Sequence, residues 1–211
     1  ANIEKYNADA KPLRKIYLSC GIRQLTSADT RNIFTHIDIL STRIATTTTV
    51  AKACSTLMER AVAYSVVQNY DAAISDLTVC INADSTNMLA YWQRAVSQSL
   101  FNNYEASRGM DVRLLAAKAE ADFDAAIKLA PDNAYLYFDR GNLRCSVKNY
   151  SHAIDDYTKA ISLNPDIAEV YFNRGLAYLK LGNKQQAVAD LSKAGELGLY
   201  DAYSIIKQQQ K

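Results

Sequence analysis

The sequence contains few residues that interrupt regular structure and few that commonly carry catalysis. Among its 211 residues are 3 prolines and 7 glycines, which favours long regular elements over many turns. It has 2 histidines and lacks the motifs of serine hydrolases, phosphate-binding loops and zinc proteases. We therefore expect no catalytic residue, no metal site and no cofactor, and we predict that the chain is not an enzyme.

A strong charge of either sign and a long apolar run are also missing. Lys and Arg together number 24 and Asp and Glu 22, which leaves a net charge of +2 without any basic cluster. Nucleic-acid-binding domains usually carry a basic stripe, so nucleic acid is not an expected partner. No apolar run approaches the ~18 residues that cross a bilayer, so membrane insertion is not expected either. We expect a soluble protein, in the cytoplasm or in an extracytoplasmic compartment.

The cysteines form no pair with two intervening residues, and their separations fit no zinc-binding pattern. The simplest interpretation is that they are small buried apolar residues. Their spacing leaves open whether any of them form a disulfide. The 4 positions are Cys20, Cys54, Cys80 and Cys145.

What the sequence does contain is a repeat. The stretch YFDRGNLRCSVKN, from Tyr137, returns 34 residues later as YFNRGLAYLKLGN, from Tyr171. In both copies an aromatic residue is followed by glycine and then by alanine, a large apolar residue and alanine again. Such a period is typical of stacked two-helix units, and the abundance of alanine favours helices. The recurring positions are Tyr137, Gly141, Ala153, Tyr157 and Ala160, then Tyr171, Gly175, Ala187, Leu191 and Ala194.

This pattern resembles the tetratricopeptide repeat, a helix–turn–helix of 34 residues with aromatic, glycine and alanine residues at these places. A further copy fits residues 54–87, and residues 88–133 begin and end like a copy but carry 12 additional residues. The closing block from Lys193 to Gly198, followed by a tyrosine-rich stretch, is similar to the C-terminal part of larger bacterial arrays of this repeat.

The resemblance implies an all-α fold, a right-handed superhelix of about four repeats. We place the repeats at residues 54–87, 88–133, 134–167 and 168–198, with a capping helix over residues 199–209. Upstream, a capping-box pattern at Thr26 and Asp29 precedes apolar residues at helical spacing, which predicts a leading helix over residues 27–45. That helix and a threonine-rich loop make up region 26–53. Residues 1–25 have no clear period and are interpreted as an extended arm.

Each predicted unit has an arginine in its first helix and an aspartate in its second helix. The two residues are 16 positions apart in three units, and 28 apart in the unit with the 12-residue insertion. Because the partner moves with the fold, the spacing predicts that each pair meets across its helix pair. The pairs are Arg60 with Asp76, Arg94 with Asp122, Arg140 with Asp156, and Arg174 with Asp190.

In the repeat that this sequence resembles, the arginine position usually holds a leucine that faces the neighbouring helix. A guanidinium buried there without a partner would be costly, so we predict four internal ion pairs. The alternative is that the arginines line a site for an acidic ligand.

In tetratricopeptide repeat proteins the first helices line a concave groove that often holds a peptide or helix of a partner. Carried over by register, the resemblance implies a mostly apolar and aromatic groove, with Asn142 as a polar anchor for a backbone amide. We expect Trp92 to dominate the binding energy, so that Trp92→Ala abolishes partner capture with little effect on the melting temperature. The groove residues are Met58, Val62, Leu89, Trp92, Val96, Tyr135, Phe138, Asn142, Glu169, Phe172 and Leu176.

An exposed apolar row of this size usually has a partner. Two alternatives remain at this point: tighter packing buries these side chains, or residues 1–25 lie in the groove. The basic residues that grip a C-terminal carboxylate in some members of the family are missing from these positions.

Three functions are consistent with the sequence. The leading hypothesis is a non-enzymatic scaffold that binds a protein or peptide partner. The second is an architectural role, in which the chain self-associates into a homo-oligomer or couples domains within a larger protein. The third, an accessory domain of an enzyme, requires catalytic residues outside this chain.

Overall fold

A computed structural model describes residues 27–209, and every regular element within that range is an α-helix. The extended arm expected for residues 1–25 lies outside the described residues. The helices are α2 (Ser27–Ala45), α3 (Val50–Val66), α4 (Tyr70–Ala83), α5 (Met88–Ser107), α6 (Arg113–Leu129), α7 (Ala134–Ser146), α8 (Tyr150–Leu163), α9 (Ala168–Lys180), α10 (Lys184–Glu196) and α11 (Asp201–Gln209).

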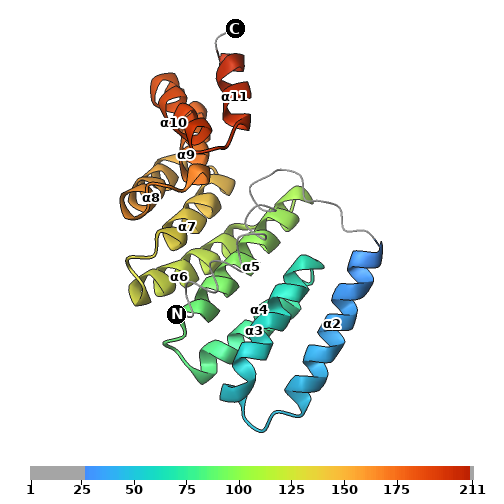
Figure 1. Ribbon diagram of the computed structural model, residues 1–211. Helices are drawn as coiled ribbons and strands as arrows, with labels where there is room; N and C mark the ends of the chain where they lie inside the picture. Colours follow the sequence, from blue (N-terminus) through green and yellow to red (C-terminus); the bar gives the residue numbers. More distant parts are fainter. Residues whose placement is uncertain (1–26, 210–211) are drawn as a thin grey trace.

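Consecutive helices pack as antiparallel hairpins, α3 with α4, α5 with α6, α7 with α8, and α9 with α10. The hairpins stack side by side along the chain, and Figure 1 shows this progression from α2 at one end to α11 at the other. The first helices α3, α5, α7 and α9 contact one another in turn and line one face of the stack. The fold is therefore an α-helical solenoid, as predicted from the period of 34 residues.

Short turns separate the two helices of each hairpin. In three hairpins the turn has three residues, and the middle one, Gln68, Lys148 or Gly182, has a φ of 62°, 64° or 77°. The residue after each of these is an asparagine, and the Asn69 side chain accepts a hydrogen bond from the Ala72 N–H. This cap satisfies a backbone donor in the first turn of the second helix.

Small residues allow the two helices of a hairpin to approach closely. A Cβ atom on Gly141 would lie 2.6 Å from Cε1 of Tyr157, so no larger residue fits without a shift. Ala61 and Ala95 occupy the same place in the two preceding hairpins and are fully buried. The alanine and glycine positions of the repeat are thus the points at which the helices touch.

The 12 additional residues lengthen the α5–α6 hairpin. α5 has 20 residues and α6 has 17, compared with 13 or 14 in each helix from α7 to α10. Phe101 and Tyr104, in the added turns of α5, pack on Tyr70 with ring centroids 5.7 Å and 6.0 Å away. The longer hairpin therefore contacts the start of α4 in the preceding unit.

The region before residue 54 contains more than a leading helix and a loop. α3 starts at Val50, directly after Thr49, whose side chain caps the helix by accepting a hydrogen bond from the Lys52 N–H. At the opposite end, α11 covers the last hairpin, and Ala202 is buried against Leu191 and Ala194.

Each of the four repeated arginines binds the aspartate of its own unit through two hydrogen bonds. In the first unit Arg60 Nε donates to Oδ2 of Asp76 over 2.8 Å, and Arg60 Nη2 donates to Oδ1 over 2.7 Å. The corresponding distances are 2.7 and 2.7 Å for Arg94, 3.0 and 2.6 Å for Arg140, and 2.7 and 2.8 Å for Arg174. All four aspartates are buried, so these are internal ion pairs with two-pronged geometry.

The arginines also reach the unit before their own, which sequence spacing did not predict. Arg94 Nη1 donates to Oγ1 of Thr78 over 3.0 Å, and Arg174 Nη1 donates to Oγ1 of Thr158 over 3.0 Å. Asp124 accepts from Arg140, and Ser41 accepts from Arg60, in the same manner. One guanidinium therefore joins three helices that belong to two successive units.

An aromatic ring lies beside each guanidinium as well. Tyr91, Tyr137 and Tyr171 precede their arginines by three residues, and their ring centroids are 5.9, 5.7 and 5.8 Å from the guanidinium carbon. For Arg60 the ring is that of Tyr64, at 5.6 Å. The hydrogen bond to Asp76 raises the pKa of Arg60 above its usual value, so the positive charge is retained.

Replacing Asp156 by alanine should lower the free energy of unfolding by about 3–5 kcal/mol. The reason is that this buried carboxylate accepts hydrogen bonds from both Arg140 and Arg144, and its loss leaves two guanidinium groups without it. Urea denaturation of the variant and the parent measures the difference.

The matched control is Asp124→Ala, which removes a carboxylate that also binds Arg140 but is 58% exposed. This variant should lose less than about 1 kcal/mol. Equal losses in the two variants would show that burial of the carboxylate is not what makes the ion pairs important.

Candidate partner-binding groove

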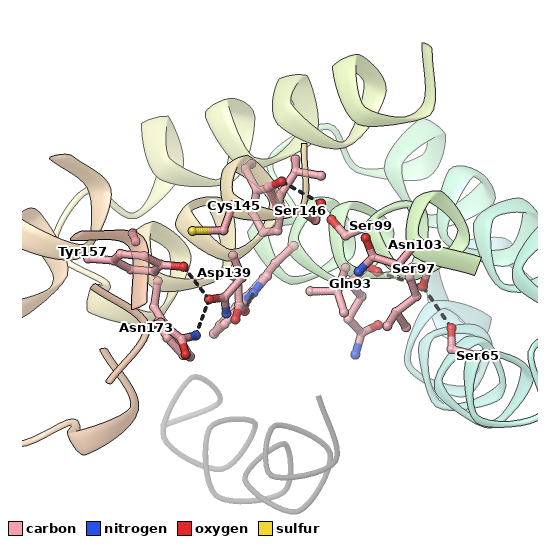
Figure 2. A pocket seen from close by; sticks show the side chains of 18 of the residues that line it. Ser65, Gln93, Ser97, Ser99, Asn103, Asp139, Cys145, Ser146, Tyr157 and Asn173 are labelled. Carbon is pink, nitrogen blue, oxygen red and sulfur yellow. Dashed lines mark hydrogen bonds between the residues drawn. The ribbon is translucent and has the colours of Figure 1, made fainter. Parts of the chain in front are cut away.

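A pocket of about 460 Å³ lies on the face formed by the first helices. It is lined mainly by residues of α3, α5, α7 and α9, together with Leu77, Phe123, Tyr150 and Tyr157 from the second helices. In Figure 2, Tyr157, Asn173 and Asp139 lie on one side of the pocket, with Ser97 and Ser65 on the other. Most of the lining is apolar, and its volume is in the range of sites that hold a few side chains of a ligand.

Hydrogen bonds fix several polar groups in the wall of this pocket. Oδ1 of Asn142 accepts from the hydroxyl of Tyr157 over 2.8 Å and from Nδ2 of Asn173 over 2.7 Å. Nε1 of Trp92 donates to Oδ2 of Asp139 over 2.7 Å. The carbonyl of Asn142 is thus already engaged, and the group that it can offer a ligand is its N–H₂.

Gln93 is a second amide in the wall of the pocket. The residue lines the pocket, and only 7% of its surface is exposed. Its Oε1 has no hydrogen-bond partner among the described residues. A buried amide oxygen without a partner is costly, so this group favours a ligand or water that can donate to it.

The titratable groups of the pocket are held neutral where they are most buried. Burial raises the pKa of Tyr157 well above its ordinary value, and burial also raises the pKa of Cys145. The thiol is therefore protonated near pH 7 and is not an activated nucleophile. Over residues 27–209, no group of three His, Cys, Asp or Glu side chains is arranged to bind a metal ion.

Seven of the eleven residues predicted for the groove do line this pocket, and the other four lie outside it. Met58 packs against buried residues of the first hairpin, and Leu89 and Tyr135 pack against the buried cluster that contains Trp92. Glu169 lies half-buried near the start of α9. The lining residues are Val62, Trp92, Val96, Phe138, Asn142, Phe172 and Leu176.

The expectation of an exposed aromatic row is wrong for Trp92 and Phe138. Both side chains are only 1% exposed. Trp92 packs with Phe123 and Leu136, and its N–H is satisfied by Asp139 in the next first helix. Trp92 therefore belongs to the core between two units, and its replacement cannot leave stability unchanged.

Sequence reasoning missed most of the polar side chains of the pocket. Gln93, Asp139 and Asn173 each directly precede a repeated arginine, so they share one register position. A polar residue that recurs directly before the repeated arginine was the signal that the sequence offered. Adjacent residues of a helix point in different directions, so this position faces a different side of the helix from the arginine. Other lining residues, such as Lys180, carry no comparable signal.

Two family models match stretches within residues 141–198. A model described as TPR repeat matches residues 141–182, and one described as tetratricopeptide repeat matches residues 168–198. No curated protein sequence matches the chain significantly.

Solved structures with a similar fold include several of MamA. A crystal structure of MamA is 24% identical with a TM-score of 0.61, and the match covers 88% of this chain and 98% of that chain. A double mutant of MamA RS-1 is 16% identical with a TM-score of 0.64, covering 91% and 96%. The TPR domain of Arabidopsis OM64 is 19% identical with a TM-score of 0.52, covering 61% and 97%. At these identities the likeness shows a common fold.

Replacing Trp92 by alanine should lower the free energy of unfolding by about 3–5 kcal/mol, because it opens a cavity between two units and leaves Asp139 without the indole N–H. Trp92→Phe keeps most of the packing and should lose less. Chemical denaturation followed by far-UV circular dichroism measures both. A Trp92→Ala variant as stable as the parent would contradict the buried position.

Proposed function

We propose, on the premise that this chain is a tetratricopeptide repeat protein, that it is a non-enzymatic scaffold that binds a segment of a partner protein in the pocket between α3, α5, α7 and α9. The observation that carries this proposal is the combination of an apolar pocket with two amide side chains whose hydrogen-bonding capacity is incompletely used. Such a surface fits a peptide, since each residue of a peptide offers an apolar side chain together with one N–H and one C=O.

The half-buried apolar residues would hold the side chains of the bound segment. Val62, Val96, Phe172 and Leu176 come from three different first helices and all border the pocket. The Asn142 N–H₂ would donate to a backbone carbonyl of the partner, and Oε1 of Gln93 would accept from a backbone N–H after a small side-chain rotation. Among the described residues that line the pocket, Lys180 is the single basic one. The pocket therefore does not provide the cluster of basic residues that would hold a terminal carboxylate.

A second candidate function is architectural, with copies of the chain associating through the ends of the solenoid. The observation that favours it is the exposure of large apolar side chains at both ends. Phe34 and Ile39 on α2 are 50% and 53% exposed, and Tyr200 before α11 is 74% exposed. End-to-end contacts of this kind would extend the stack without using the pocket.

The first test uses variants of the pocket. Leu176→Asp and Val96→Asp place a charge in the apolar wall, and each should weaken binding of a purified partner at least about tenfold. The partner is first found by crosslinking and then measured by isothermal titration calorimetry. The control is Leu129→Asp on α6, where the parent side chain is 41% exposed away from the pocket.

The controls separate loss of binding from loss of fold. Circular dichroism should give the same helical content for all three variants. If both pocket variants bind the partner as tightly as Leu129→Asp does, the pocket is not the binding site.

The second test distinguishes the two functions. Static light scattering over a hundredfold range of concentration should give the mass of a monomer throughout if the scaffold function holds alone. A mass that rises with concentration, and that returns to the monomer value in Tyr200→Ser, would favour the architectural function.

A further inference from the structure

Two cysteines face each other across the first hairpin. Cys54 lies on α3 and Cys80 on α4, and the thiol of Cys80 donates a hydrogen bond to the main-chain oxygen of Cys54 over 3.5 Å. The Cys54 side chain packs against the buried cluster that contains Cys80. Both cysteines are free, so the structure shows the reduced form of this pair.

The register of the repeat sets this pair apart from the rest of the stack. Cys80 is the counterpart of Ala160 and Ala194, and both of these alanines are fully buried. Cys54 is the counterpart of Ala134 in the third unit, where Ala134 and Ala160 belong to one buried cluster. The two cysteines therefore occupy a pair of positions at which another unit brings two small side chains together.

Contact between small side chains provides the geometry that a disulfide needs. Where two alanines from facing helices pack together, their Cβ atoms are the atoms that touch. A disulfide joins Cβ atoms that are about 3.5–4.5 Å apart, which is close to the separation of two methyl carbons in contact. Cysteine at both positions therefore supplies two sulfur atoms that can bond with little movement of the helices.

The two thiols differ in how easily an oxidant can reach them. Cys80 has an exposed fraction of 0%, whereas Cys54 is partly exposed. Burial raises the pKa of the Cys80 thiol to about 12, and a hydrogen bond with the Cys54 side chain contributes to this rise. Cys80 therefore stays protonated near pH 7, and Cys54 is the thiol that meets an oxidant first.

We propose that Cys54 and Cys80 are a thiol pair that a small-molecule disulfide, such as oxidised glutathione, converts to a disulfide between α3 and α4. The Cys54 thiolate attacks one sulfur of the oxidant, which releases the other sulfur as a thiolate and leaves a mixed disulfide on Cys54. The sulfur of Cys80 then loses its proton and displaces the second half of the oxidant from Cys54. In total the two protein thiols lose two electrons and two protons, and the oxidant is reduced to two thiols.

The disulfide would close residues 54–80 into a loop that contains most of α3, the turn and most of α4. The ion pair between Arg60 and Asp76 lies within this loop. A cross-link reduces the conformational freedom of the unfolded loop, so oxidation would stabilise the first hairpin. The reaction uses neither the pocket nor a second chain, and it is independent of the proposed partner binding.

Mass spectrometry of the full-length chain tests whether the two thiols join. The background chain carries Cys20→Ser and Cys145→Ser, so that Cys54 and Cys80 are its remaining cysteines. After exposure to excess oxidised glutathione, free thiols are alkylated and the chain is digested with trypsin. Peptides 53–60 and 61–94 should be recovered joined in most of the molecules, and should separate on reduction.

Cys80→Ala is the matched control, because alanine occupies this place in the other three units. Without Cys80 the mixed disulfide on Cys54 cannot be resolved, so the fraction of Cys54 that carries glutathione should rise at least about tenfold. Equal amounts of this adduct in the background chain and in Cys80→Ala would overturn the proposal, because the two thiols would then not meet. A background chain in which both thiols stay reduced, or in which two copies are joined through Cys54, would overturn it as well.

A second readout measures the effect of oxidation on the fold. Oxidation should raise Tm of the background chain by at least about 5 °C, and dithiothreitol should reverse the rise. The double variant Cys54→Ala with Cys80→Ala has the alanine pair of the third unit, so it should fold, and the same treatment should change its Tm by less than about 1 °C. An unchanged Tm in the oxidised background chain would contradict a cross-link within the native hairpin.

Discussion

The stack depends on a charge that is removed from water inside every unit. Each repeated arginine lies between two units, held by a buried aspartate of its own second helix and by a hydroxyl or carboxylate of the preceding one. A guanidinium is suited to this place because its planar, five-donor group can satisfy three helices at once. A leucine would fill the same space but would not fix the rotation of one hairpin relative to the next. The arginine therefore fixes the relative orientation of successive hairpins as well as stabilising them, and the shape of the pocket depends on that orientation.

The pocket is a consequence of the same stacking. The first helices are held side by side on one face, and Gln93, Asp139 and Asn173, which directly precede three of the repeated arginines, line the pocket on that face. Asp139 shows most directly how stacking and the pocket are connected. It lies on α7 and accepts a hydrogen bond from the N–H of Trp92 on α5, the first helix of the preceding unit. Packing between units thus buries the largest aromatic side chains. The lining that is accessible to a partner consists of smaller apolar residues and amides.

The periodic part of the structure could be predicted from the sequence, and the part between units could not. The 34-residue period predicted the hairpins, and a constant spacing predicted which aspartate each arginine meets, because both are set within one unit. The bonds from Arg94 to Thr78 and from Arg60 to Ser41 cross unit boundaries. The prediction that Trp92 is exposed was wrong for the same reason, because the burial of this side chain depends on how closely the next hairpin approaches.

The longer α5–α6 hairpin has a consequence for how the chain finds its native order. Hairpins with nearly equivalent contact faces can dock out of sequence during folding, or exchange places between two molecules, because each wrong neighbour looks much like the right one. Among the described units, the packing of Phe101 and Tyr104 against Tyr70 occurs at one junction. These contacts form only when the α5–α6 hairpin packs next to the α3–α4 hairpin. Mispaired intermediates would lack them and would therefore be less stable than the native arrangement.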